Sequence, residues 1–338
     1  MMGKDLPSKN LLYCTDVFAD ISNVNLFEGE ELLHPEELEQ MPTEVTYKDN
    51  YGMIHHHYLD TRMKAKDHQT DIAIFCVENQ SGISNIMPVR DMGYLYSNYN
   101  EQIRNWQRED EKRGDFHITK GIGREEKLIP VISIVLYYGR EEWTGPEKLS
   151  DMLSIPDPWK EKLVSLITDH TVRIVHLAGQ DKKTRQRYKS DFRHIVDYLA
   201  CAGDREECQK YIKDKTRKII HPEEYLDMMA AFSSDTRFLQ IKEMVLKREK
   251  GESVTMYSIA EELENVGKRK GMEEGIKEGI KEGKEEGIRK IICHMLEHKK
   301  SPEDVSELTG EPVEYVYRIQ KEYLALVRED KNYDTKKD

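Results

Sequence analysis

Residues 55–81 read HHHYLDTRMKAKDHQTDIAIFCVENQS and contain the clearest strand signal of the N-terminal region. The run from 72 to 77 is continuously apolar, rich in Ile and Val, and short enough to be a buried strand. The preceding segment, 58–65, can pair with it as a hairpin through the polar turn at 66–70. We therefore expect a hairpin whose second strand lies inside a sheet.

Polar side chains follow directly where this apolar run ends, at Glu78, Asn79 and Gln80. Side chains two apart on a strand share a face, so Glu78 and Gln80 point together and Asn79 points away. The hairpin would bring Asp60 on the neighbouring strand within reach of Glu78. Two carboxylates beside a polar group suit a hard cation such as Mg2+. The alternative is that Glu78 only begins a solvated loop, and the spacing does not decide between the two.

A resemblance to a known family favours the metal site. An Asp followed downstream by Glu-x-Gln resembles the core of PD-(D/E)XK nucleases, in a variant where Gln replaces the usual Lys. The wider sequence resembles the Rpn family of recombination-promoting nucleases, often labelled putative transposases. The Glu-Asn-Gln-Ser and Tyr-Tyr-Gly…Trp blocks are the more specific matches, and the Leu-Asp-Thr-Arg block around Asp60 is looser. Together with the C-terminal glycine repeat, the matching segments are 17–23, 27–29, 35–38, 78–81, 87–90 and 130–146.

The resemblance implies a metal-dependent DNA endonuclease that acts on double-stranded DNA, in recombination or mobile-element activity. Asp60 and Glu78 would hold Mg2+ or Mn2+, and Gln80 would take the position of the catalytic lysine. Asp20, in a predicted first helix over 11–27, is a candidate third metal carboxylate, and a solvated or capping role is equally open. Arg90 is a candidate phosphate-binding residue, and an ordinary surface ion pair is equally open.

The predicted fold class is α/β, a restriction-endonuclease-like core with a mixed central sheet flanked by helices, plus a helical C-terminal extension. Alternating helices and buried strands support it, with a long helix over 88–110 and strands over 128–138 and 171–178. We expect the nuclease core over 1–200, a helical layer packed on it over 201–250, a Gly-rich charged helix or tether over 251–290, and a helix-turn-helix-like pair over 291–330.

Composition limits the kind of protein further. The 338 residues carry a formal net charge of −12, which argues against a protein that coats nucleic acid through bulk charge. A nuclease remains compatible, because a local basic patch can dock the DNA. The sequence has no apolar run long enough to span a membrane, so we expect no membrane partner and a cytoplasmic location. Its five scattered cysteines indicate neither a disulfide framework nor a structural zinc site.

Two further features concern metal binding and assembly. The three histidines at 55–57 suggest zinc, but no spaced Cys or His pair nearby completes a tetrahedral set. A glycine recurs every fourth residue from 267 to 287. Such a glycine line allows close helix–helix approach and suggests a homo-oligomer, at least a dimer, whereas the alternative is a flexible charged tether. The rival to the nuclease function is a DNA-binding or assembly protein of a mobile element with a weak or inactive site.

Overall fold

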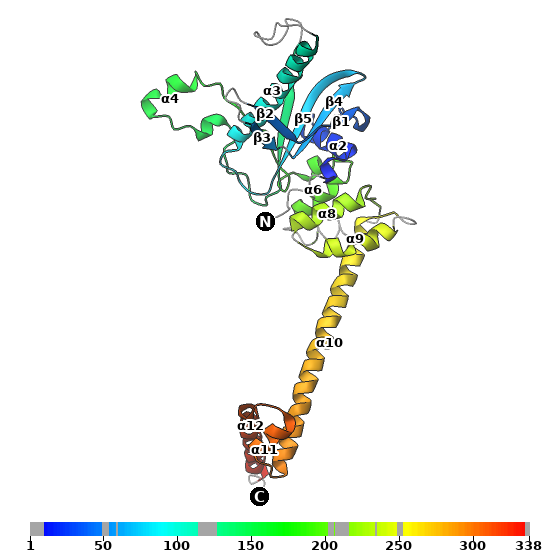
Figure 1. The fold of residues 1–338 in the computed structure, drawn as a ribbon, viewed down its shortest axis with the longest axis vertical. Coiled ribbons are helices and arrows are strands. Elements are labelled where there is room, and N and C mark those ends of the chain that lie inside the picture. The colour runs from blue at the N-terminus through cyan, green and yellow to red at the C-terminus, as the bar shows by residue number, and fades with distance from the viewer. Residues whose placement is uncertain are drawn as a thin grey trace. The chain divides into compact units, whose positions relative to one another are not determined.

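The structure is a computed structural model that describes residues 10–48, 54–58, 60–113, 127–201, 206, 216–233, 235–248 and 253–334. It divides into two compact units, Met1–Leu263 and Glu264–Asp338. Figure 1 shows the order of their elements along the chain. The first unit holds the α/β core and the candidate site, and the second is wholly helical.

The first unit is built on a five-stranded mixed sheet with the order β1-β4-β5-β6-β7. β1 pairs antiparallel with β4, which pairs antiparallel with β5, whereas β5, β6 and β7 run parallel. The sheet confirms the predicted α/β class with a mixed central sheet. The strand bounds are β1 Leu38–Gln40, β4 Thr61–Asp67, β5 Thr70–Gln80, β6 Val131–Tyr137 and β7 Ile174–His176.

The predicted hairpin is present as β4 and β5, with Thr61 opposite Val77 and a turn at His68, whose φ is 53°. Two details differ from the prediction. The buried run begins at Ala73, because Ile72 is 48% exposed. The expected strand over 58–65 is also broken, because β3 (Ile54–Tyr58) pairs with β2 (Glu44–Lys48) in a separate two-stranded sheet. The histidines at 55–57 lie on β3, and their side chains are outside the described residues.

Helices cover both faces of the sheet (Figure 1). The helix α3 (Met87–Arg113) packs through Tyr94 on the face that holds Ile74 and Cys76. The opposite face holds Phe75, which meets Phe27 at the end of α2 (Thr15–Leu26) with 6.4 Å between ring centroids. β5 therefore presents its even-numbered side chains to α3 and its odd-numbered ones to the α2 side.

The buried face of α3 is partly polar, and two of the helix's large side chains, Met92 and Tyr96, are 39% and 56% exposed. The side of α3 that is buried instead carries Asp91, Tyr94 and Asn98. These polar groups have partners: Asp91 contacts His170 at 2.6 Å, and Asn98 donates to the Tyr94 carbonyl at 2.8 Å. Polar side chains thus share this layer with the apolar contacts of Leu95 and Tyr99.

Shorter helices complete the first unit. α8 packs onto the end of β6, where Phe232 stacks on Tyr138 with 4.1 Å between ring centroids. α4 was not predicted, and its apolar Trp159 is 56% exposed. The bounds are η1 Pro35–Glu37, η3 Leu149–Met152, α4 Asp157–Val164, α5 Lys182–Arg185, α6 Phe192–Cys201, α8 Pro222–Ser233 and α9 Arg237–Arg248.

α10 (Met256–Glu297) is one continuous helix of 42 residues that carries the glycine repeat, and its C-terminal part belongs to the second unit. It is followed by α11 (Pro302–Thr309) and α12 (Val313–Asp334), and these helices confirm the predicted helical C-terminal extension. The Ser301 hydroxyl caps α11 by accepting the Asp304 N–H. A small core of Ile292, Val305, Val316 and Ile319 joins the three helices. In the described part of the chain, no helix meets the length and hydropathy needed to cross a membrane.

Candidate functional site

The hairpin register brings Asp60 and Glu78 to the same edge of the sheet. Thr61 lies opposite Val77, so the next residues outward along the two strands are Asp60 and Glu78. The chain bends at Asp60, and its Oδ2 accepts the backbone N–H of Asn79 at 2.7 Å. The Tyr13 hydroxyl donates to the Asp60 carbonyl oxygen at 3.4 Å. Asp60 is thus held directly beside the polar end of β5.

Glu78 lies on the face of β5 that α3 covers, and it is only 7% exposed. Its Oε1 forms an ion pair with the Arg90 guanidinium and accepts a hydrogen bond from the Tyr94 hydroxyl at 3.3 Å. Arg90 also donates to the Tyr94 hydroxyl oxygen at 3.0 Å. Arg90 and Tyr94 are four residues apart on α3, so they share one face of the helix. The buried carboxylate of Glu78 therefore contacts both the guanidinium of Arg90 and the hydroxyl of Tyr94.

Gln80 points to the same side as Glu78, as the alternation of strand side chains predicts. Its Oε1 accepts a weak, long hydrogen bond from Arg90 Nη1 at 3.4 Å. Arg90 consequently spans both residues of the Glu-x-Gln pair. In this structure the proposed phosphate-binding residue serves as the counter-ion of Glu78, and its side chain is 34% exposed.

Asn79 points to the opposite face and ties the site to the helical layer. Its Oδ1 accepts the Tyr138 hydroxyl at 2.9 Å, and Tyr138 stacks on Phe232 of α8. Burial, and secondarily the negative charge of Asp60, raise the pKa of Tyr138 well above its ordinary value, so the phenol stays a neutral donor. Asn79 Nδ2 is buried and has no hydrogen-bond partner among the described residues.

Tyr94 and Tyr138 are site residues that the sequence reasoning missed. A signal for Tyr94 existed, because it follows Arg90 by one helical turn. Tyr138 belongs to the Tyr-Tyr-Gly block of the family resemblance, but its contact with Asn79 joins residues 59 positions apart and could not be read from the sequence.

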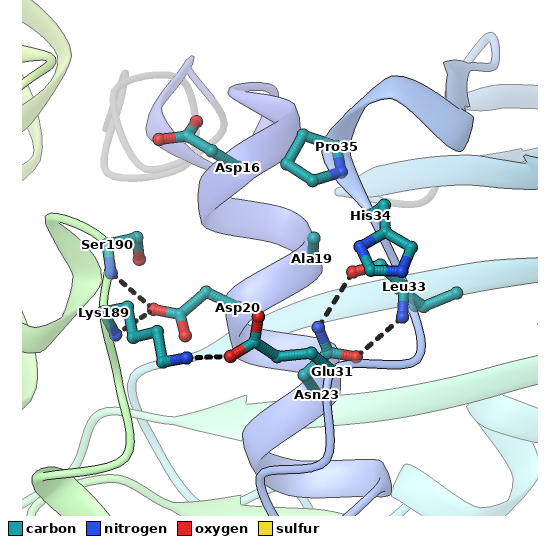
Figure 2. Close-up of a pocket in the computed structure, with 10 residues that line it drawn as sticks. All are labelled: Asp16, Ala19, Asp20, Asn23, Glu31, Leu33, His34, Pro35, Lys189 and Ser190. Atoms are coloured by element: carbon teal, nitrogen blue, oxygen red, sulfur yellow. Dashed lines mark hydrogen bonds and ion pairs between the residues drawn. The ribbon is translucent and has the colours of Figure 1, made fainter.

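Asp20 has a different set of contacts (Figure 2). Its Oδ2 accepts the backbone N–H groups of Lys189 and Ser190 at 2.9 and 2.7 Å. It lines a pocket of about 230 Å3 that lies between α2 and the segments around Glu31 and Lys189. The side chains of Glu31 and Lys189 form an ion pair. Asp60, Glu78 and Gln80 do not line this pocket. Asp20 on α2 thus anchors the loop before α6.

The donor chemistry of the Asp60–Glu78 edge fits a magnesium ion, because Mg2+ is commonly held by one or two carboxylates together with waters and substrate phosphates. Asp20 does not extend this pair to three ligands. Among the described residues, the only group of three or more His, Cys, Asp or Glu with ligand atoms within 4.8 Å of one another is Cys14, Asp16 and His221. A cation at Asp60 and Glu78 would also compete with Arg90 for Glu78.

Comparison with known proteins finds one family model that is similar to part of the chain. Neither a curated protein nor a solved structure matches the chain. Residues 52–215 match the family model described as putative transposase, YhgA-like, and this segment includes the whole hairpin, α3 and β6. The description places the family among proteins with mobile-element functions. Residues 52–215, just under half of the chain, are thus similar to the YhgA-like putative transposases, the Rpn and PD-(D/E)XK-like family that the sequence resembles.

Proposed function

We propose that the chain is a metal-dependent DNA endonuclease that hydrolyses phosphodiester bonds in a mobile-element or recombination process. The observation that carries this proposal is the register of the hairpin, in which Thr61 lies opposite Val77, so that Asp60 lies beside the polar end of β5 and accepts the Asn79 N–H. Gln80 and Arg90 lie on the Glu78 side of the same edge. Two carboxylates, an amide and a guanidinium are thereby gathered beside one sheet edge.

Each side chain has a distinct task in this proposal. Asp60 and Glu78 would hold the cation, whose bound form polarises a scissile phosphate and lowers the pKa of an attacking water. Gln80 offers a neutral amide that orients water or phosphate by hydrogen bonds and supplies no positive charge. The planar guanidinium of Arg90 is suited to bind a phosphate through two hydrogen bonds when Arg90 no longer pairs with Glu78.

The Arg90–Glu78 ion pair supports a second candidate function. While Arg90 neutralises a buried Glu78, that carboxylate is a weaker ligand for a second cation. If the Arg90–Glu78 ion pair persisted when the chain is bound to DNA, the protein would bind the DNA of a mobile element, or assemble on it, without cleaving it. The two functions make opposite predictions about metal-dependent strand cleavage.

The experiment is incubation of the purified full chain with supercoiled plasmid in Mg2+, Mn2+ or EDTA. We expect nicked or linear DNA with either metal and intact plasmid with EDTA. Binding that weakens with salt, with no cleavage in either metal, would favour the second function. Cleavage that persists in EDTA would contradict a metal-dependent site altogether.

A further inference from the structure

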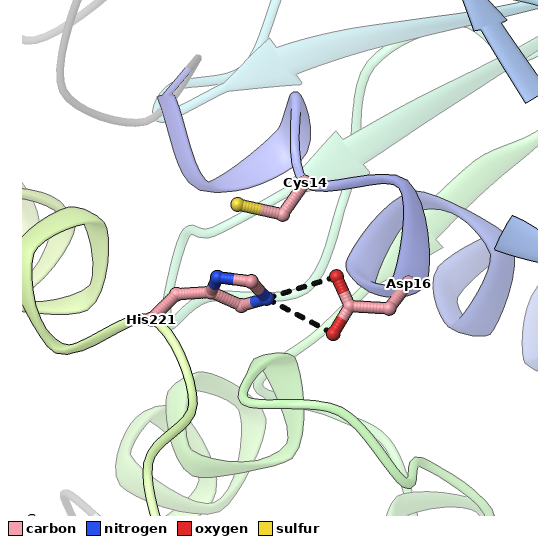
Figure 3. Close-up of side chains that lie close together, drawn as sticks. All are labelled: Cys14, Asp16 and His221. Carbon is pink, nitrogen blue, oxygen red and sulfur yellow. Dashed lines mark hydrogen bonds and ion pairs between the residues drawn. The ribbon is translucent and has the colours of Figure 1, made fainter.

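A second, chemically different ligand cluster lies in the first unit, away from the carboxylate edge of β5. It consists of Cys14, Asp16 and His221, all partly buried, with one ligand atom from each within 4.8 Å of the others (Figure 3). His221 Nε2 lies 2.9 and 3.0 Å from the two carboxylate oxygens of Asp16. We propose that Cys14, Asp16 and His221 form a zinc site that clamps the start of α2 to the segment before α8.

The donor set favours zinc over the hard cation proposed for Asp60 and Glu78. Thiolate sulfur and imidazole nitrogen are soft or borderline ligands, which suit Zn2+, whereas Mg2+ is held by oxygen. Three protein ligands leave a fourth tetrahedral position for water or another acceptor. A zinc ion with ordinary bond lengths keeps its nitrogen and oxygen ligands about 3.4 Å apart. The observed separations of His221 and Asp16 need only a small widening to reach this value.

The backbone around the cluster is already fixed in place. Cys14 is the N-cap residue of α2, and Asp16 lies in the first turn of that helix. On the other side, the buried carboxylate of Asp191 accepts the backbone N–H groups of Ile220 and His221, the latter at 2.6 Å. Two ligands on a helix end and one on a pinned segment form a site that needs little rearrangement.

No strong hydrogen bond holds the Cys14 thiol, which donates only weakly to the Asn10 carbonyl, at 3.8 Å. Zinc binding converts it to the thiolate, forms the Zn–S bond and releases one proton to solvent.

Cobalt spectroscopy of the full chain tests the site directly. We expect Co2+, added to protein dialysed against a chelator, to give a near-ultraviolet thiolate-to-metal absorption that Zn2+ abolishes by displacing the cobalt. Cys14→Ser should lose this absorption, and Cys293→Ser, which removes a cysteine of the second unit, should keep it. Asp60→Asn should also keep it, which separates the zinc site from the proposed nuclease centre.

A second measurement guards against misfolding of the Cys14 variant. His221→Gln keeps the thiol and should weaken Zn2+ binding at least about tenfold, the lower limit seen even when an outer-shell partner of a metal is lost. Zn2+ should raise the melting temperature of wild type and Cys293→Ser by mass action, and at the same concentration it should raise that of His221→Gln by less. A cobalt absorption that is absent from wild type, or that survives Cys14→Ser, would overturn the proposal.

Discussion

Gln80 is the residue that distinguishes this site from one with a catalytic lysine. It reaches toward Arg90 on the Glu78 face of β5, where a phosphate oxygen or water would also meet it. We expect Gln80→Ala to lower the plasmid cleavage rate by about 10- to 1,000-fold, the range for loss of one preorganised hydrogen-bonding group. Gln80→Lys should keep measurable cleavage. Metal binding should change little in Gln80→Ala, since a neutral amide is a poor Mg2+ ligand beside two carboxylates.

Gln69→Ala is the matched control for this series, because Gln69 is an exposed residue in the turn at the other end of the same hairpin. Rates are compared under single-turnover conditions at saturating metal. Equal rates for Gln80→Ala and wild type would remove the Glu-x-Gln pair from the chemistry.

The contribution of Asp20 to the stability of the folded state is predicted to depend on pH. Burial raises its pKa above the ordinary value, against the lowering effect of its hydrogen bonds from Ser190 and Lys189. The folded state therefore holds the proton more tightly than the unfolded chain, so the Asp20 contribution to stability falls as pH rises through the unfolded pKa, about 3.9, toward the folded one. The amide that replaces this carboxyl in Asp20→Asn does not titrate.

We therefore expect the stability of Asp20→Asn, relative to wild type, to increase between about pH 3 and pH 7. Urea unfolding at several pH values measures this trend, and a relative stability that falls with pH would contradict it. Cleavage should stay near the wild-type rate in this variant. A large loss of cleavage would instead return Asp20 to the metal site as its third carboxylate.

At the scale of elements, β5 and α3 show what the sequence can and cannot predict. The apolar run of β5 predicted a buried strand with Glu78 and Gln80 on one face, because strand alternation is a local property of the backbone. The buried face of α3 could not be predicted in this way. Asp91 is buried there because His170, 79 positions away, pairs with it, and a hydropathy pattern contains no information about partners distant in sequence.

The candidate site, too, could be predicted only in part from the sequence. Its core, Asp60 with Glu78 and Gln80, followed from spacing and family resemblance. The ion pair of Arg90 with Glu78 and the contact of Tyr138 with Asn79 depend on how α3 and α8 pack, so they required the structure.

The support that α8 gives to β5 can be tested at Tyr138, which is 5% exposed and stacked on Phe232. Tyr138→Phe keeps the ring but removes the hydroxyl that Asn79 Oδ1 accepts. We expect a loss of about 1 to 3 kcal/mol in the free energy of unfolding, the usual cost of leaving a buried polar group unsatisfied. Tyr198→Phe, at a partly exposed position of α6, serves as the control and should leave stability unchanged. Equal stability of both variants would show that the Tyr138 bond contributes nothing.

For the whole molecule, α10 presents an unusual surface within the second unit. A Cβ added at Gly271, Gly275, Gly279, Gly283 or Gly287 would meet nothing within 4 Å. Beside this glycine line, Met272, Ile276 and Ile280 are 70%, 52% and 54% exposed. Each glycine lowers helix propensity by about 1 kcal/mol relative to Ala, so a helix with this many of them needs stabilisation from elsewhere. We propose that a second copy of α10 supplies it.

We expect the full chain to be at least a dimer by light scattering. Ile276→Gln with Ile280→Gln should shift it toward monomer, because the apolar contact area is lost. Lys277→Gln with Lys281→Gln is the matched control on the neighbouring polar positions and should remain dimeric. A wild-type chain that is monomeric at micromolar concentration would contradict this assembly and favour a solvated tether.

The central claim, that Asp60 and Glu78 form a metal-dependent cleavage site, is tested most directly by replacing one carboxylate and a matched one elsewhere on the same hairpin. Asp71 pairs with Lys64 at 3.1 Å, near the opposite end of β5, so Asp71→Asn makes the same chemical change away from the site. We predict that Asp60→Asn, folded by circular dichroism, loses Mg2+-dependent plasmid cleavage while Asp71→Asn cleaves at the wild-type rate. Equal cleavage by Asp60→Asn and wild type would contradict the claim.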